Sequence, residues 1–487
     1  MKKAIRRRSW GRACVAVTLG LTLGVLSGCD SLLDVSLPAQ LTDAALTDPK
    51  GAPTLMNSVI AHFEDAYDFH TYRTFGREEG GEVYLCGPMC DVSNYVTDYG
   101  HFTTFARSLD FNRILRGHLT TDWTVAEVPL RDRYLAQTSL YEGASLAVFG
   151  MNLCEITLNG GKKQTPDEIL TLADQALTRA LAEIQTAGDF AVQNGIATSA
   201  RTMTYGLRAQ VRWFKGDNAG AAADAALVPQ GFVAYVTREA GDRLNRGYNS
   251  GTGGGFFELY DPVNWWTGLP NPVNGKTWPT VIPFTGWTYL GILPDGRAIG
   301  DDGIPVRTRA GWQNAVGVAA SAVIDTRVTH RTSIIQGKPT TNGEVPTKYT
   351  SDGADIPLVN WKEMILIRAE IAGGQTAIDL VNTLRTADNL PRVTYASPAN
   401  ATQIKYMIWE ERRRALYDEA RFFYTKLKNL DTFWFPRDNG GTRGQRRALR
   451  GGVRYTMPTT EYIANTNLTN ADKATGCAVN ERPVNPL

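Results

Sequence analysis

The sequence lacks the motifs that most enzymes use to hold a metal, a nucleophile or a nucleotide. Only five histidines occur in 487 residues, and no two are spaced as helical metal ligands. There is no H-E-x-x-H or G-x-S-x-G motif, and the glycine run at 251–255 lacks the G-K-[ST] ending of a phosphate loop. Asp295, Asp301 and Asp302 lie in a glycine-rich stretch, and a calcium site formed by their carboxylates is an alternative that the sequence does not exclude. We predict no catalytic residue, no metal and no cofactor, although 49 acidic residues leave a glycosidase-like carboxylate pair open.

Long hydrophobic runs are also missing. The longest, Ala13 to Leu26, is too short to span a bilayer, which takes about 20 residues. Six basic residues and no acidic ones precede it, and Leu26-Ser27-Gly28-Cys29 follows. This order is typical of a secretory signal, and its end resembles a bacterial lipobox. We therefore predict a signal peptide at 1–28 and lipidation of Cys29, with an ordinary signal peptide and a chance cysteine as the alternative.

The excess positive charge of the chain lies in this predicted signal peptide. Removing its six positive charges takes the formal net charge from +2 to −4, so no basic face for nucleic acid is expected. No long low-complexity linker divides the remaining 459 residues. One large domain with inserted loops is therefore the prediction.

Cysteines are few. One leaves with the leader, and four remain besides Cys29: Cys86, Cys90, Cys154 and Cys477. An even number in an exported chain indicates disulfides. We predict a local bridge between Cys86 and Cys90 and a second bridge between Cys154 and Cys477. Zinc is the alternative, but no histidine lies near any of these cysteines in the sequence.

Apolar residues recur at helical spacing along most of the chain. Helices are predicted at 49–68, 122–149, 165–188, 203–213, 219–227, 361–373 and 375–387. Residues 71–105 are predicted to be loops. The stretch 241–300 holds 12 glycines and 6 prolines, which exclude a long helix, together with ten aromatic residues. Long ordered loops of this kind are often functional.

Two local signals place the helices more sharply. Thr165-Pro166-Asp167-Glu168 has an N-cap residue, a proline at the first helical position and acids in the first turn. Gly216-Asp217 is a turn between two short helices. Helix pairs joined by short turns are typical of tetratricopeptide-like repeats.

The segment Thr402–Leu430 is predicted to be one long helix with a single apolar stripe. Glu411, Glu419 and Arg421 interrupt the stripe. Because an unpaired charge out of water costs several kcal/mol, we expect these charges to form ion pairs with neighbouring helices.

Several motifs in this order resemble the SusD/RagB family. The motifs are Glu411-Arg412 with Leu416 and Glu419-Ala420-Arg421, then Val381-Asn382-Thr383-Leu384-Arg385, the helix pair Arg201 to Ala226, and a tail with Met457-Pro458, Glu461 and Asn465. Ala415 and Thr466 depart from the family pattern. We interpret Asn382, Arg385, Glu411, Arg412, Glu419 and Arg421 as structural pairs and caps.

The resemblance implies a mainly α fold, with a tetratricopeptide-like scaffold of helical hairpins and long insertions of loops and short strands. Repeat-like helices would occupy about 122–228 and 361–430 of a single domain at 29–487, and a loop-rich insertion about 229–350. Members of the family bind glycans through aromatic residues of an early loop and of the middle insertion. The corresponding candidates here are Tyr84, Tyr95, Tyr99, Trp265, Trp266, Trp278, Trp287 and Tyr289. Alternatively, these rings fill the core of the insertion or contact a transporter.

The implied function is that of a lipid-anchored protein of the outer membrane, facing the cell surface. It would bind a glycan or oligosaccharide and deliver it to a TonB-dependent, SusC-like transporter, without making or breaking a bond. Three alternatives stay open: a peptide-binding lipoprotein of the same family, a surface glycoside hydrolase, and a repeat scaffold for protein partners alone.

Overall fold

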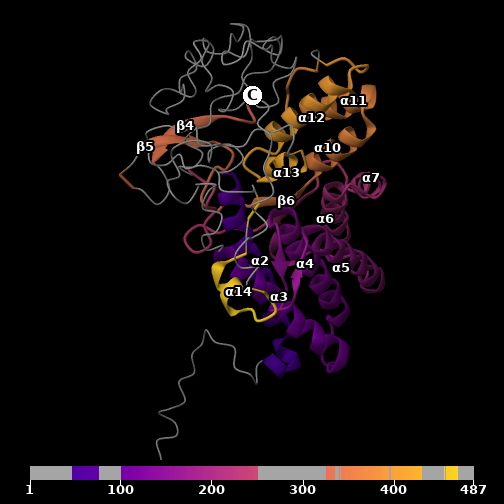
Figure 1. Ribbon diagram of the computed structural model, residues 1–487, viewed down its shortest axis with the longest axis vertical. Coiled ribbons are helices and arrows are strands. Elements are labelled where there is room, and N and C mark those ends of the chain that lie inside the picture. Colours follow the sequence, from indigo (N-terminus) through magenta and orange to yellow (C-terminus); the bar gives the residue numbers. More distant parts are fainter. Residues whose placement is uncertain are drawn as a thin grey trace, which may run out of the picture. The chain divides into compact units, whose positions relative to one another are not determined.

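The computed structural model describes residues 46–75, 100–249, 325–334, 339–340, 342–393, 396–429, 454–455 and 457–469. The chain divides into two units, Met1–Leu46 and Thr47–Leu487, and every element named below lies in the second. Helices dominate the described part, and its strands form only two-stranded sheets (Figure 1). The prediction of a mainly α fold is confirmed.

The scaffold consists of helices that pack in sequential pairs. The helices are α2 (Ala52–Phe75), α3 (Gly100–Thr121), α4 (Arg131–Asn152), α5 (Pro166–Ala187), α6 (Ala200–Lys215), α7 (Asn218–Ala226), α10 (Trp361–Ala372), α11 (Gly374–Ala387), α12 (Ala401–Ala415), α13 (Arg421–Lys428) and α14 (Thr459–Ala464), with short 3₁₀ turns η2 (Pro49–Gly51) and η6 (Gln193–Gly195). Within the described residues, α2 packs on α3, α4 on α5, α6 on α7 and α10 on α11. Helix α10 also packs on α6 and α7, which continues the series of hairpins.

The start of α5 follows the local signal in its sequence. The Thr165 side chain accepts a hydrogen bond from the Glu168 backbone N–H, and the Glu168 carboxylate accepts one from the Thr165 backbone N–H at 2.7 Å. This reciprocal capping box satisfies two backbone donors that a helix start otherwise leaves unpaired. The predicted start of this helix is therefore confirmed.

Glycines bring α4 and α5 into close contact. A Cβ atom added at Gly143 would lie 2.5 Å from Leu177 Cγ, and one at Gly150 would lie 2.6 Å from Leu170 Cγ. No real Cβ approaches a carbon so closely, so larger residues at these positions would push the helices apart. The close approach fixes the position of α5, which forms one wall of the pocket described below.

The first helices differ from their prediction. The helix predicted at 122–149 begins only at Arg131, and α3 was not predicted at all. Residues 71–105, predicted to be loops, are helical at both ends, because α2 continues to Phe75 and α3 begins at Gly100. Polar residues on the buried face of α3 explain the error. Ser108 donates to the Val59 carbonyl and Asn112 to the Thr138 carbonyl. Because these buried positions hold polar residues, the helical spacing of apolar residues is interrupted in the sequence of α3.

The segment predicted to be one helix at Thr402–Leu430 is two helices, α12 and α13, so that prediction is wrong. Asp418 and Ala420 between them have φ of 58° and 59°, in the left-handed region. Partners from 348–360 hold this break: Tyr349 Oη donates to the Asp418 carbonyl at 2.8 Å, and Lys348 Nζ donates to the Glu419 carboxylate at 2.7 Å. The break therefore depends on distant contacts that helical periodicity does not contain.

Replacing Ala420 with glycine should raise the free energy of unfolding by about 0.5–1 kcal/mol. An L-residue pays roughly 1–2 kcal/mol in the left-handed region, and the greater freedom of glycine in the unfolded chain offsets part of this. Chemical denaturation measures the change. As a control, Ala223→Gly on the exposed face of α7 should lower stability by about 1 kcal/mol. Equal losses in both variants would contradict the strain at Ala420.

Three antiparallel strand pairs accompany the helices. Strand β1 (Ile156–Thr157) pairs with β2 (Lys163–Gln164), β3 (Val233–Val236) with β6 (Ile356–Asn360), and β4 (His330–Ile334) with β5 (Asn342–Pro346). The pairing of β3 with β6 brings together the two ends of residues 237–355. That excursion overlaps the insertion predicted at about 229–350, whose bounds stay a prediction. Its described parts are 237–249 at the outgoing end and 325–334, 339–340 and 342–355 at the returning end.

The tail packs beside the end of α4 and β1. The Tyr455 backbone bonds to Asn152 and Cys154 at 2.8 and 2.9 Å, and Thr157 donates to the Glu461 carboxylate. Asn465 Nδ2 donates to the Gly161 carbonyl at 3.0 Å. Two polar positions of the tail motif therefore tie the chain end to the scaffold.

Candidate functional site

All eight aromatic residues predicted to bind ligand lie outside the described residues: Tyr84, Tyr95, Tyr99, Trp265, Trp266, Trp278, Trp287 and Tyr289. The same holds for Cys29, for the acidic group at Asp295, Asp301 and Asp302, and for the glycine run at 251–255. Their roles stay predictions. The described residues do contain both ends of the insertion and one pocket of the helical scaffold.

Helix α2 holds the outgoing end of the insertion through buried acids. Glu64 and Asp68 are 2% and 1% exposed. The Glu64 carboxylate accepts hydrogen bonds from the Thr237 backbone and from Arg243, both at 2.8 Å. Asp68 accepts from the Arg246 backbone at 3.0 Å and also pairs with the Arg246 side chain. Residues 237–246, at the start of the insertion, are therefore fixed to α2.

Helix α12 holds the returning end. Arg327 Nη1 donates to Glu411 at 2.8 Å and Nη2 to Asp325 at 2.8 Å. Arg385 of α11 donates to the other oxygen of Glu411 at 2.8 Å, and Arg414 donates to Asp325 at 3.1 Å. All five side chains are at most 7% exposed. The ion pair expected between Glu411 and a neighbouring helix is confirmed by Arg385 of α11. Glu411 therefore joins α11, α12 and the returning part of the insertion.

Burial and the neighbouring positive charges have opposite effects on the pKa values of the acids in this network. Burial would raise the pKa of Glu411, but Arg327 and Arg385 outweigh it, so the pKa lies below its ordinary value. Asp325 behaves likewise: burial opposes ionisation, and Arg327 with Arg414 lowers the pKa well below the ordinary value. At the outgoing end, burial prevails and raises the pKa of Glu64 and Asp68. The two ends therefore respond to acid with opposite sign.

The difference in stability between the wild type and a Glu411→Gln variant should shrink in acid. A carboxylate whose pKa is lower in the folded state stabilises the fold above its unfolded pKa, about 4.3, and loses this contribution as pH falls through its folded value. The difference should be constant from about pH 5 to 8 and decrease below about pH 4. Urea denaturation of both proteins across this range measures it, and a difference that grows in acid would contradict the ionised state of Glu411.

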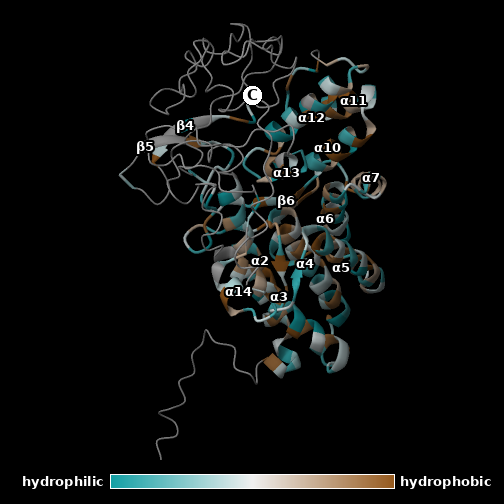
Figure 2. Ribbon diagram, in the orientation of Figure 1, coloured by the Kyte–Doolittle hydropathy of each residue, from teal (hydrophilic) through white to brown (hydrophobic). Residues whose placement is uncertain are grey.

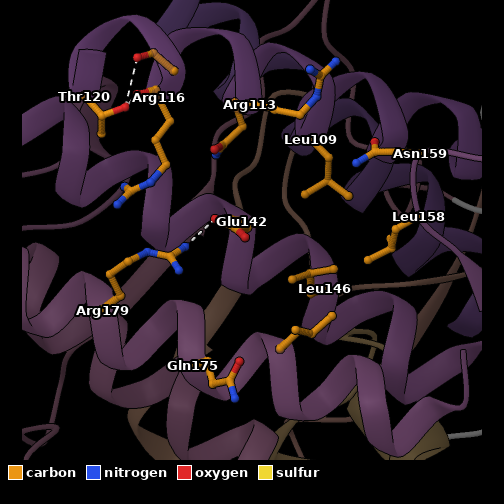
Figure 3. A pocket seen from close by; sticks show the side chains of 13 residues that line it. Leu109, Arg113, Arg116, Thr120, Glu142, Leu146, Leu158, Asn159, Gln175 and Arg179 are labelled. Carbon is orange, nitrogen blue, oxygen red and sulfur yellow. Dashed lines mark hydrogen bonds and ion pairs between the residues drawn. The ribbon is translucent and has the colours of Figure 1, made fainter. Parts of the chain in front are cut away.

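A pocket of about 460 Å³ lies among α3, α4, α5 and the turn after β1 (Figure 3). Residues of these elements form its lining: Leu109, Asn112, Arg113, Arg116, Gly117, Thr120, Glu142, Leu146, Leu158, Asn159, Leu172, Gln175 and Arg179. In Figure 3, Leu109, Leu146 and Leu158 gather on one side, and the Arg179–Glu142 pair lies on the other. Apolar and charged surfaces therefore face the same space.

Internal contacts fix two of the pocket's arginines. Arg116 donates to Glu183 and, through Nη1, to Ser139 Oγ at 2.8 Å. Arg179 Nε donates to Ser139 Oγ at 2.9 Å, and Nη2 donates to Glu142 Oε2 at 2.5 Å. Because these two side chains are already oriented, they lose little further conformational entropy when a ligand binds.

The prediction from sequence missed this pocket because it missed α3. Four of the polar lining residues lie on α3 at intervals of one, three and four: Asn112, Arg113, Arg116 and Thr120. That spacing is helical, but the residues are not apolar. A test for helical spacing of polar residues would have found them.

Cys154, two residues after the end of α4, is 7% exposed and disulfide-bonded. Its partner lies outside the described residues, so the pairing with Cys477 stays a prediction, as does the bridge from Cys86 to Cys90.

The described residues contain no group of three or more histidine, cysteine or acidic side chains arranged to hold a metal ion. Within the same part, none of the helices combines the length and hydropathy of a membrane span. Figure 2 shows hydrophilic and hydrophobic residues mixed along the labelled helices.

No protein-family model matches the sequence, and no curated protein matches it either. Solved structures do match. A SusD-like carbohydrate-binding protein from Bacteroides fragilis aligns with a TM-score of 0.54 and 14% identity, over 88% of this chain and 100% of its own. Surface glycan-binding protein A from Bacteroides thetaiotaomicron, solved with laminarihexaose, aligns with a TM-score of 0.54 and 14% identity, over 86% and 98%.

A third match is a SusD superfamily protein from Parabacteroides distasonis, with a TM-score of 0.51 and 13% identity over 88% of this chain and 99% of that one. The alignments cover nearly the whole of each neighbour. At this identity they show the fold, and the chain has the SusD-like fold that its motifs indicate.

Proposed function

We propose that this protein is a lipoprotein of the SusD/RagB family that binds a glycan or oligosaccharide at the cell surface. The observation that carries the proposal is the SusD-like fold, which extends over 86% of the chain in the alignment with a neighbour solved with laminarihexaose. The aromatic residues of the insertion supply the binding chemistry. Their rings present apolar faces with polar edges, which suits the flat C–H faces of sugar rings.

The scaffold supports this role by fixing the ends of the insertion. Glu64 and Asp68 hold its start, and Glu411 holds its return. Ligand-binding loops gain affinity when they are ordered before the ligand arrives, because less entropy is lost on binding. The buried ion pairs thus serve binding without touching the ligand.

We further propose that the protein is anchored to the outer membrane by lipid on Cys29 and delivers its ligand to a SusC-like, TonB-dependent transporter. The lipobox at 26–29 supports the anchor. The transporter partner follows from the family resemblance. In this role the protein holds its ligand and leaves every covalent bond of it intact.

The protein without residues 1–29 should bind at least one oligosaccharide from a panel that includes laminarihexaose. Isothermal titration calorimetry against glycans and against a peptide panel measures this directly. Release of reducing sugar from each polysaccharide is followed in parallel and should stay at the level of the buffer.

Each alternative has its own outcome in this test. Binding to peptides alone would replace the glycan proposal with the peptide-binding one. Release of reducing sugar would identify a glycoside hydrolase. Binding to neither class would leave a scaffold for protein partners.

A further inference from the structure

The pocket among α3, α4 and α5 lies on the helical scaffold and shares no residue with the aromatic set predicted to bind glycan. We propose that it is a second ligand site, for a small aliphatic carboxylate that carries a neighbouring N–H donor. An N-acylated leucine has this chemistry, whether as a free molecule or as the C-terminal residue of a peptide. The inference goes beyond the proposed function and stands independently of it.

The size and the apolar part of the pocket suit such a ligand. Its volume of about 460 Å³ lies within the range of small-molecule sites, about 300–1,000 Å³. Leu109, Leu146 and Leu158 form one side, and Leu172 of α5 also lines it. These side chains come from three helices and one turn, so the scaffold forms a concave aliphatic surface that a branched side chain fills.

The described lining contains no aromatic ring. Stacking on a sugar face is therefore not available from these residues, and this distinguishes the pocket from the site proposed for glycans. Aliphatic surface beside charge indicates an amphipathic ligand in place of a carbohydrate.

Arg113 is the cation available to a carboxylate. Its ion pair with Asp110 is 3.8 Å long, and the two side chains are 65% and 52% exposed. Such an exposed pair contributes little and is easily exchanged. Arg116 and Arg179, by contrast, already pair with Glu183 and Glu142. Arginine binds carboxylates through two parallel hydrogen bonds, which gives both strength and orientation.

Asn112 supplies an acceptor inside the pocket. The residue is 3% exposed, and its Nδ2 donates to the Thr138 carbonyl at 2.7 Å, which fixes the amide. Among the described residues, no donor bonds to its Oδ1. Nearby, Glu142 uses Oε2 for Arg179 and has no described partner at Oε1. A ligand N–H could therefore bond to either oxygen without displacing a hydrogen bond of the described residues.

Gly117 provides a way to close the pocket without disturbing the fold. It lies on α3, lines the pocket, and a Cβ added to it would meet nothing within 4 Å. Leucine is a better helix former than glycine, so Gly117→Leu should fold at least as well as the wild type. Its side chain would occupy the space of the ligand.

Calorimetric titration of N-acetyl-leucine into the protein lacking residues 1–29 tests the site. Saturable binding is expected in the wild type, and Gly117→Leu should abolish it. Arg113→Met should weaken it by about tenfold or more, since a charge-assisted pair is lost. N-acetyl-leucine amide and N-acetylglycine, which lack the charge or the side chain, should bind more weakly. A tripeptide ending in leucine shows whether a peptide end is accepted as well as the free compound.

Arg107→Met is the matched control, because Arg107 is an exposed arginine of α3 outside the pocket lining. It should leave binding unchanged. No saturable binding at millimolar N-acetyl-leucine, or equal binding by the wild type and Gly117→Leu, would overturn the proposal. Titration of laminarihexaose into the same proteins separates the two sites. Gly117→Leu should not change glycan affinity, and a wild type that binds only N-acetyl-leucine supports this pocket and contradicts the proposed function.

Discussion

Replacing Glu411 with glutamine is expected to lower the free energy of unfolding by about 3–5 kcal/mol, the usual loss when one partner of a buried ion pair is removed. Glu411 is 0% exposed, and its two oxygens accept hydrogen bonds from Arg327 and Arg385. Glutamine keeps the shape but removes the charge. The charge of Arg327 then stays buried with one ion pair fewer, and water cannot reach it to replace the lost carboxylate.

Urea denaturation at pH 7 measures this loss. Asp110→Asn is the control, because Asp110 forms an exposed ion pair with Arg113. That variant should remain within about 1 kcal/mol of the wild type. If Glu411→Gln is equally mild, the network at the end of the insertion does not stabilise the fold.

Replacing Trp265, Trp266, Trp278 and Trp287 together with alanine is expected to weaken glycan binding by at least about a hundredfold. Tryptophans at the centre of a binding surface typically contribute about 2 kcal/mol or more each. If at least two of the four contact the ligand, the loss reaches about 4 kcal/mol, since each 1.4 kcal/mol is tenfold in affinity. Calorimetry with the oligosaccharide that the wild type binds best measures the change.

Trp123→Phe is the control for this variant. Trp123 is 6% exposed and stacks on His118 with ring centroids 4.7 Å apart, so its loss affects packing at the end of α3. Its variant should bind glycan as the wild type does. Thermal unfolding of the quadruple variant confirms that it is folded, and unchanged affinity in a folded quadruple variant would remove these tryptophans from the binding surface.

Local signals in the sequence were sufficient where the structure depends on neighbours in the chain. The capping box at Thr165 and the turn at Gly216, where φ is 90°, involve residues within four positions of each other. Periodicity failed where the decisive partners are distant. The break at Asp418 depends on Tyr349, and the polar buried face of α3 depends on α2 and α4.

The sequence also predicted the roles of single motif residues better than it predicted a site assembled from several helices. The motif residues Glu411 and Arg385 were expected to form structural pairs or caps, and the structure pairs them with each other at 2.8 Å. The Asn382 side chain, expected to act as a structural cap, accepts a hydrogen bond from the Val393 backbone at 2.8 Å. The pocket on α3 was not foreseen, because it is assembled from three helices whose packing no single stretch of sequence contains.

The fixed ends of the insertion have a consequence for how such proteins diverge. Glu64 and Asp68 on one side and Glu411 on the other determine where the segment leaves and rejoins the scaffold, whatever lies between them. Under the proposed function, the interior of the insertion can change to bind a new ligand while these junctions keep their contacts. Under the proposed function, exchanging the part of the insertion between Arg246 and Asp325 for that of a related chain would change the bound ligand and keep the contacts with α2 and α12.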